Sequence, residues 1–207
     1  MMSKCIVMDP PWPEQGGGKI KRGADRHYKL IKKKEDILRV VLRAERKIIY
    51  PSMGGGTHEK VLPVFSPDPE GCHLWIWVTS NYLPWGLWLM DALGFTYKRE
   101  FAWVKAVEYL SAKIFILERP GIGQYSMGQH ELLLFGTRGK AMKPAAKDRP
   151  RSVITAPRPK DADGKMIHSA KPPEAYAMIE KVSLEPRLEM FARQPREGWT
   201  VWGDEVE

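Results

Sequence analysis

The residues best suited to chemistry stand near the N-terminus, in the tetrapeptide Asp9-Pro10-Pro11-Trp12. Asp9 supplies a carboxylate, and the prolines fix the backbone so that the Pro10 carbonyl is held in place. A carboxylate and a carbonyl together can accept hydrogen bonds from both protons of an amino group. The Trp12 ring can stack on an aromatic base that carries such an amine, a contact worth about 1–3 kcal/mol. The tetrapeptide therefore favours a site that orients and polarises an exocyclic aryl amine.

A short apolar segment, residues 4–8, leads directly into Asp9 and predicts a buried strand. Pro10 and Pro11 end that strand, because proline has no backbone N–H to donate to a neighbouring strand. The carboxyl end of the strand then presents Asp9. The alternative is an ordinary turn at the exit of a strand, since Asp-Pro is a common turn pair.

The rest of the chain alternates between predicted strands and helices. Strands are expected at residues 47–50, 73–79, 101–105, 131–135, 187–192 and 199–202, and helices at 33–47, 84–93 and 172–181. Residues 13–26, 106–129 and 137–150 are expected to be loops. This alternation predicts an α/β fold with a mostly parallel sheet and helices on both faces. Ligands of such sheets bind beyond the carboxyl ends of the strands, so Asp9, Thr79, Lys105 and Arg193 are expected to face one crevice.

Length and composition narrow the class of protein. The 207 residues suit one domain spanning 1–207, and the 43% hydrophobic content is ordinary for a packed globular protein. No apolar run reaches the roughly eighteen residues that a membrane span needs, so no membrane association is expected. Cys5 and Cys72 provide neither a disulfide framework nor the spacing of a metal site. A reduced, cytoplasmic protein without a metal is the expectation, and the sequence gives no oligomeric state.

The net charge of +8 favours a polyanionic partner, with nucleic acid the leading class. The basic residues gather in two segments, expected to flank the site and to contact phosphates: Lys19, Lys21, Arg22, Arg26, Lys29, Lys32, Lys33 and Lys34; and Arg138, Lys140, Lys143, Lys147, Arg149 and Arg151. Phosphate contacts of this kind supply affinity without sequence information.

A series of motifs in a fixed order carries a resemblance to a known family. The matching segments are residues 9–12, 27–28, 74–79, 94–95, 103–105, 130–134, 136–139, 171–174, 187–193 and 198–205. In this order and spacing the chain resembles the DPPW-type adenine-N6 methyltransferases. That family includes the catalytic subunit of the eukaryotic messenger-RNA adenosine methyltransferase, and this chain looks like one of its bacterial and phage members. The resemblance covers the chain apart from roughly residues 35–70.

The resemblance implies a Rossmann-like class I methyltransferase fold with permuted motif order, and S-adenosylmethionine as the methyl donor. It places Lys171 and Arg193 at the carboxylate of the methionine moiety. Asp204 and Glu205 would bind the ribose and adenine ends, and Met190 would line the cofactor cleft. The residues implied for catalysis are Asp9, which would also lie near the cofactor's amino group, Pro10, Pro11 and Trp12; those implied for the base pocket are Tyr28, Trp103, Lys105 and Glu131.

Two departures from the family pattern stand out. The family often has a neutral amide where Asp204 stands, which puts the ribose contact in doubt. The chain also lacks a Gly-x-Gly cofactor loop after Phe191. The region around Gly54-Gly55-Gly56 looks like an insertion, and no role is assigned to it.

Several alternatives stay open at this point. Methylation of cytosine N4 has similar geometry, but those enzymes usually carry serine in place of Asp9. A pseudoenzyme and a non-catalytic basic nucleic-acid-binding module are the others. DNA is favoured over RNA as the substrate, because a short chain without an added recognition domain resembles the prokaryotic and phage members.

Overall fold

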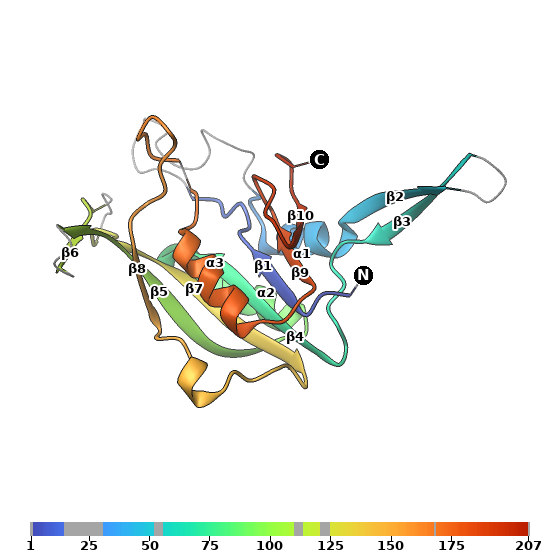
Figure 1. Cartoon of the computed structure of the whole chain (residues 1–207), viewed down its shortest axis with the longest axis horizontal. Helices are drawn as coiled ribbons and strands as arrows, with labels where there is room; N and C mark the ends of the chain where they lie inside the picture. Colours follow the sequence, from blue (N-terminus) through green and yellow to red (C-terminus); the bar gives the residue numbers. More distant parts are fainter. Residues whose placement is uncertain are drawn as a thin grey trace.

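The computed structural model describes residues 2–14, 31–51, 56–109, 114–120, 125–167 and 169–206, which form a twisted sheet with helices packed on it (Figure 1). The strand order is β10-β9-β1-β4-β7-β5-β6, and β8 pairs with β5 outside this path. The strands of this sheet are β1 (Cys5–Met8), β4 (Gly71–Val78), β5 (Thr96–Tyr109), β6 (Ile114–Leu117), β7 (His130–Gly139), β8 (Val153–Ala156), β9 (Arg187–Met190) and β10 (Trp199–Trp202). The other elements are α1 (Lys34–Arg43), α2 (Leu83–Ala92), α3 (Pro173–Val182), the short 3-10 helices η2 (Ser80–Tyr82) and η3 (Ala146–Asp148), and a separate hairpin of β2 (Glu45–Pro51) and β3 (Thr57–Pro63).

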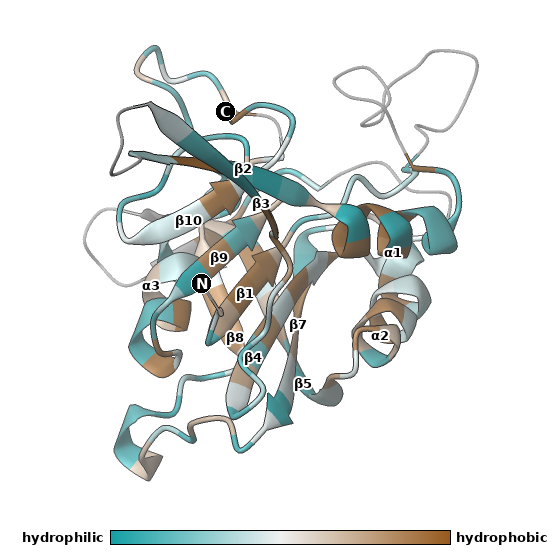
Figure 2. Ribbon diagram, turned by 90° about the vertical axis from the view of Figure 1, so that its right-hand side faces the viewer, coloured by the Kyte–Doolittle hydropathy of each residue, from teal (hydrophilic) through white to brown (hydrophobic). Residues whose placement is uncertain are grey.

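The central strand β1 is buried on both sides, which explains its continuous apolar sequence. Ile6 and Met8 face one hydrophobic core, and Cys5 and Val7 face the other, all with no exposed surface. Helices α1 and α2 supply residues to the first core and α3 to the second. Figure 2 shows the sheet between α3 on one side and α1 and α2 on the other. The predicted placement of helices on both faces is therefore observed.

The predicted parallel sheet holds for one half of the structure. Strands β10, β9, β1 and β4 are parallel neighbours, whereas β7 runs antiparallel between β4 and β5. No described helix lies between β5 and β7, and strands joined without a helical crossover pair antiparallel. The loop expected over residues 106–129 is wrong in part, because β5 continues to Tyr109 and pairs with β6.

The antiparallel course of β7 decides where the second basic segment lies. Leu132 pairs with Val78 near Asp9, whereas Gly139 pairs with Gly71 at the other end of β4. Seven residues of strand separate the two positions by about 23 Å. The prediction that residues 138–151 flank the site is therefore wrong: they follow the far end of β7, on the side where η3 lies in Figure 1.

The first basic segment falls largely on residues 15–30, which lie outside the described residues. Its described end does return to the site, because the Ile31 amide donates a hydrogen bond to the Pro11 carbonyl at 3.3 Å. No helix in the described ranges is long and apolar enough to cross a membrane.

Candidate active site

Asp9 follows the last residue of β1, at the carboxyl edge of the parallel strands, as predicted. Its amide donates a 3.4 Å hydrogen bond to the Met190 carbonyl at the end of β9. Its Oδ2 atom lies 2.9 Å from Nζ of Lys171, which stands just before α3. The Asp9 side chain is 23% exposed, so it is partly accessible, whereas that of Lys171 is buried at 8%.

The Lys171 ammonium connects Asp9 to a second carboxylate. Its Nζ lies 3.2 Å from Oε2 of Glu131 on β7, and Oε1 of Glu131 lies 2.7 Å from Nζ of Lys105 on β5. Lys171 also donates to the Ser169 carbonyl at 3.2 Å. Four charged side chains from four segments thus form one row of alternating sign, Asp9, Lys171, Glu131 and Lys105, which we call the charge network.

An ammonium group has three protons, and these three contacts occupy all of them. Lys171 therefore has no donor left for a cofactor carboxylate in this arrangement. The structure shows Lys171 as the partner of Asp9 and Glu131, and its predicted role at the methionine moiety stays a prediction. A buried cation that neutralises two carboxylates avoids the cost of leaving either charge unpaired.

The two carboxylates of the charge network have pKa values shifted in opposite directions. Burial raises the pKa of Asp9 above its ordinary value, Lys171 offsets this in part, and Glu131 adds a like-charge contribution in the raising direction. Burial would also raise the pKa of Glu131, but Lys171 and Lys105 outweigh it and lower that pKa to about 2. Glu131 has two ammonium partners where Asp9 has one, so Glu131 is the stronger acid. Opposing burial, the two carboxylates raise the pKa of Lys171, which stays charged.

The backbone after Asp9 is held by short local hydrogen bonds. The Pro10 carbonyl accepts from the Trp12 amide at 2.7 Å, and the Trp12 carbonyl accepts from the Glu14 amide at 2.7 Å. Pro10 is buried, while Pro11 is partly exposed. A carbonyl has two lone pairs, so Pro10 keeps one acceptor site after binding the Trp12 amide. The Pro10 carbonyl thus lies in a turn closed by the Trp12 amide, and its predicted role as an acceptor for the amine stays a prediction.

The stacking role predicted for Trp12 is not what the structure shows. The Trp12 side chain is 5% exposed, and its indole N–H donates to the Trp77 carbonyl at 2.8 Å. One face lies parallel to the Tyr82 ring, with 6.0 Å between centroids. This correction has a physical reason: a large apolar ring with one N–H is satisfied in a core that offers a carbonyl. Trp12 holds the turn that carries Asp9 and Pro10 against β4.

Two further predictions are corrected in the same way. Trp103 is 1% exposed and donates its indole N–H to the Ala156 carbonyl at 2.9 Å, so it packs inside rather than lining a base pocket. Met190 has no exposed surface and lies in the core beneath the site. Both belong to strands whose side chains face the helices. Tyr28 lies outside the described residues.

The remaining predicted cofactor residues gather after β9 and β10. Arg193 follows β9, and its Nε lies 3.7 Å from Oε1 of Glu205. Asp204 and Glu205 follow β10 and are exposed. Gly203 lies so close to Ala192 that an added Cβ would sit 2.2 Å from the Ala192 carbonyl oxygen, which fixes the two strand exits against each other. A cation and two carboxylates at the same sheet edge fit an amino-acid carboxylate together with the hydroxyls of a ribose.

Other residues of this edge were not predicted as site residues. Trp77 on β4 places its ring 5.5 Å from Nζ of Lys171, a cation–π contact, and its buried indole N–H lacks a partner among the described residues. Behind it, the buried Glu189 accepts from the Tyr176 hydroxyl at 2.5 Å and lies 3.3 Å from Nε of Arg196. That group ties the loop after β9 to α3. In the sequence, Trp77 stands in the continuous apolar run of β4, and Glu189 is the one carboxylate of β9.

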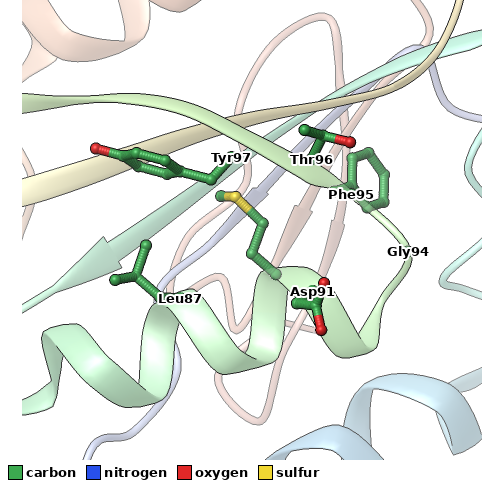
Figure 3. A pocket seen from close by; sticks show the side chains of 7 residues that line it. Leu87, Asp91, Gly94, Phe95, Thr96 and Tyr97 are labelled. Carbon is green, nitrogen blue, oxygen red and sulfur yellow. The ribbon is translucent and has the colours of Figure 1, made fainter.

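A pocket of about 480 Å³ lies elsewhere, between the end of α2 and the start of β5 (Figure 3). Leu87, Asp91 and Tyr97 are among the residues that line it. Thr96 pairs with Thr137, so this pocket belongs to the same end of the sheet as the second basic segment. It is therefore separate from Asp9, and we assign it no role in the chemistry.

Comparison with known proteins assigns the chain to a family. The MT-A70 family model matches residues 3–205. The chain belongs to the MT-A70 family. Among curated proteins, the type II methyltransferase M.MunI from Mycoplasma sp is 27% identical over 208 residues, which cover 98% of this chain and 77% of the relative. The MT-A70 match confirms the resemblance drawn from the ordered motifs, and with it the α/β, Rossmann-like methyltransferase fold.

Proposed function

We propose that this MT-A70 chain transfers a methyl group from S-adenosylmethionine to the N6 amine of adenine in DNA. The observation that carries the proposal is the charge network, which holds the Asp9 carboxylate next to the fixed Pro10 carbonyl at the carboxyl edge of the sheet. The chemistry of these two acceptors suits an amine with two protons.

The adenine amine is a weak nucleophile because its lone pair is delocalised into the ring. Asp9 and the second lone pair of the Pro10 carbonyl accept hydrogen bonds from its two N–H groups, which orients the nitrogen and increases its electron density. Asp9 uses Oδ2 for Lys171 and keeps Oδ1 for this contact. The carboxylate also stabilises the positive charge that develops on the nitrogen as the N–C bond forms and the S–C bond breaks. The methylated amine then loses one N–H proton to solvent and returns to neutrality. Glu131 offsets the opposing charge of Lys171.

Residues after β9 and β10 would hold the methyl donor, which supplies an electrophilic methyl group on its sulfonium. Arg193 would pair with the carboxylate of the methionine moiety, and Asp204 and Glu205 would hydrogen-bond the ribose and adenine ends. The Arg193–Glu205 ion pair keeps these side chains at the same edge as Asp9. Gly203 fixes that edge through its close approach to Ala192. Lys171 acts on Asp9 instead of on the donor.

DNA is the proposed substrate over RNA, since the relative is by its name a type II methyltransferase. The alternatives are transfer to RNA, transfer to cytosine N4, and nucleic-acid binding without catalysis. Asp9 favours adenine over cytosine N4, because cytosine-N4 methyltransferases usually carry serine in the position of Asp9. If the target is in a duplex, its base must leave the stack at a cost of a few kcal/mol.

The test is incubation of the chain with methyl-labelled S-adenosylmethionine and adenine-containing DNA and RNA, followed by digestion and mass spectrometry of the nucleosides. The proposal predicts label in N6-methyladenine from DNA, exceeding that from RNA. Label in N4-methylcytosine would overturn the choice of base. Salt-dependent binding without any transfer would identify a binding module instead.

A further inference from the structure

The hairpin of β2 and β3 projects from the body of the molecule, away from the main sheet (Figure 1). Its base is fixed in the core: Ala44 and Val64 are buried, and the Val64 amide donates to the Ala44 carbonyl at 2.8 Å. Beyond that base the strands continue through seven residue pairs, from Glu45↔Pro63 to Pro51↔Thr57. The hairpin is thus an arm with a buried attachment and two exposed faces.

The two faces differ in charge, because cross-strand partners and every second residue share a face. One face carries both glutamates of the hairpin, and Glu59 pairs there with Lys47 at 2.9 Å. The opposite face contains no carboxylate. We call it the basic face; its residues are Arg46, Ile48, Tyr50, His58, Lys60 and Leu62.

The basic face combines cations with exposed rings and apolar groups. Tyr50 and His58 lie side by side with 5.5 Å between ring centroids, and the Tyr50 side chain is 44% exposed. Lys60 is exposed beside them. Within the described ranges, neither Arg46 nor Lys60 forms an ion pair, and Arg46 is half-buried at the base of the arm. A two-stranded hairpin covers neither of its own faces, so these groups are left for a partner.

We propose that the basic face docks on duplex DNA beside the target adenine, an inference that rests on the proposed function. Arg46 and Lys60 contact backbone phosphates, and Tyr50 and His58 lie against the groove. Seven residue pairs extend about 20 Å. A two-stranded ribbon of this kind fits the major groove of B-DNA, which is about 12 Å wide.

Charge complementarity favours DNA over a second copy of this chain. The chain carries a net charge of +8, so a copy would be repelled on average, whereas phosphates complement two cations without a carboxylate. Glu59 lies on the opposite face, paired with Lys47, so its carboxylate is kept away from the phosphates. The arm therefore adds affinity for the duplex outside the charge network.

The test measures the affinity of the full chain for a fluorescent 30-base-pair duplex across a series of salt concentrations. The double variant Arg46→Gln/Lys60→Gln is compared with Lys143→Gln/Lys147→Gln, which removes the same charge at the opposite end of the sheet. The first variant should bind about tenfold more weakly at 0.1 M salt, with a salt slope shallower by about 2. The control should match the wild type, and thermal melts should show both variants folded.

Methyl transfer to a short single-stranded adenine oligonucleotide is measured in parallel for the wild type and for the Lys143→Gln/Lys147→Gln control, and both should show the same rate. Wild-type affinity and slope in Arg46→Gln/Lys60→Gln would overturn the arm's role and leave the proposed function intact. An equal loss in both variants would also overturn it, since net charge alone would then explain the effect. Tighter binding of duplex RNA, with the same loss, would contradict DNA as the partner. Absence of transfer by the wild type would instead refute the proposed function.

Discussion

The two ends of the sheet use charge in opposite ways. At the carboxyl end of β1, four charged side chains are largely buried and alternate in sign, with Lys171 between Asp9 and Glu131. At the other end, the basic segment of residues 138–151 is mostly exposed, and its Asp148 reaches Lys181 at a loose 3.6 Å. Both ends are rich in charge, but one holds its charges in place and the other solvates them.

A cluster of basic residues in the sequence does not by itself locate a site. Charges at the solvated end are screened and contribute little individually. Charges at the buried end cost free energy unless each is paired, and that requirement fixes their geometry. The chemistry belongs where charge is buried and constrained, so changes at the two ends should have unequal effects.

The largest difference between the ends should come from their aspartates. Asp9→Ala removes an acceptor of the amine and should lower the rate of methyl transfer about 10²–10³-fold, with donor affinity largely kept. Asp148→Ala, the matched control, should leave the rate unchanged. Single-turnover transfer and calorimetry of donor binding measure both quantities. Retained turnover in Asp9→Ala would contradict the catalytic assignment.

The next largest difference should be in the free energy of unfolding, when Lys171 at one end or Lys181 at the other is replaced. Lys171→Met leaves two buried carboxylates without their shared cation and should reduce the free energy of unfolding by about 3 kcal/mol. Lys181→Met removes an exposed partner of Asp148 and should change it by less than about 0.5 kcal/mol. Urea titration at neutral pH gives both values. Equal losses would mean that the charge network contributes no special stability.

A buried histidine near the solvated end offers a smaller, pH-dependent effect. His73 is 2% exposed, with Nδ1 2.9 Å from Ser183 Oγ and Nε2 2.8 Å from the Met142 carbonyl. Burial lowers the pKa of His73, so its neutral form is favoured on folding. Its stabilisation is complete above about pH 6.5 and is lost as pH falls through the folded pKa, at up to about 1.4 kcal/mol per pH unit.

Urea unfolding at pH 7.5 and pH 5.5 checks this contribution. His73→Gln should show a smaller loss of stability between the two pH values than the wild type. The exposed His58 serves as control, and His58→Gln should keep the wild-type difference. If His73→Gln loses as much unfolding free energy between the two pH values as the wild type, other groups govern the acid response.

The smallest effect should come from Lys143→Gln/Lys147→Gln. Both side chains are exposed beyond the far end of β7, so stability should change by less than about 0.5 kcal/mol. The rate of transfer should match the wild type. A large loss of transfer would restore the prediction that residues 138–151 contact the substrate.

Part of this picture could be predicted from the sequence. The apolar run into Asp9 and the ordered motifs located the central strand, the family and the residues Asp9, Lys105, Glu131 and Lys171. The sequence could not show that Lys171 pairs with two carboxylates, because that depends on the packing of β5, β7 and the segment before α3. A lysine at a strand edge is equally compatible with a ligand and with a neighbouring acid.

The misplaced residues share a physical reason. Trp12 and Trp103 are compatible with a core or with a base, and only the presence of a carbonyl near each indole N–H decided for the core. The position of residues 138–151 depended on the direction of β7, which periodicity cannot reveal. Local patterns predicted the elements, whereas orientation and burial came from contacts distant in sequence.

The role of the charge network in activating Asp9 is tested by the pH dependence of single-turnover transfer in wild type and Glu131→Gln. Asp9 must be ionised to accept from the amine, so the rate should fall as pH drops through its raised pKa. Glu131→Gln removes a like charge and leaves Asp9 as the sole carboxylate partner of Lys171, which lowers the pKa of Asp9. The acidic limb should therefore move to lower pH in the variant. An unchanged limb, or one moved to higher pH, would contradict the role of the charge network.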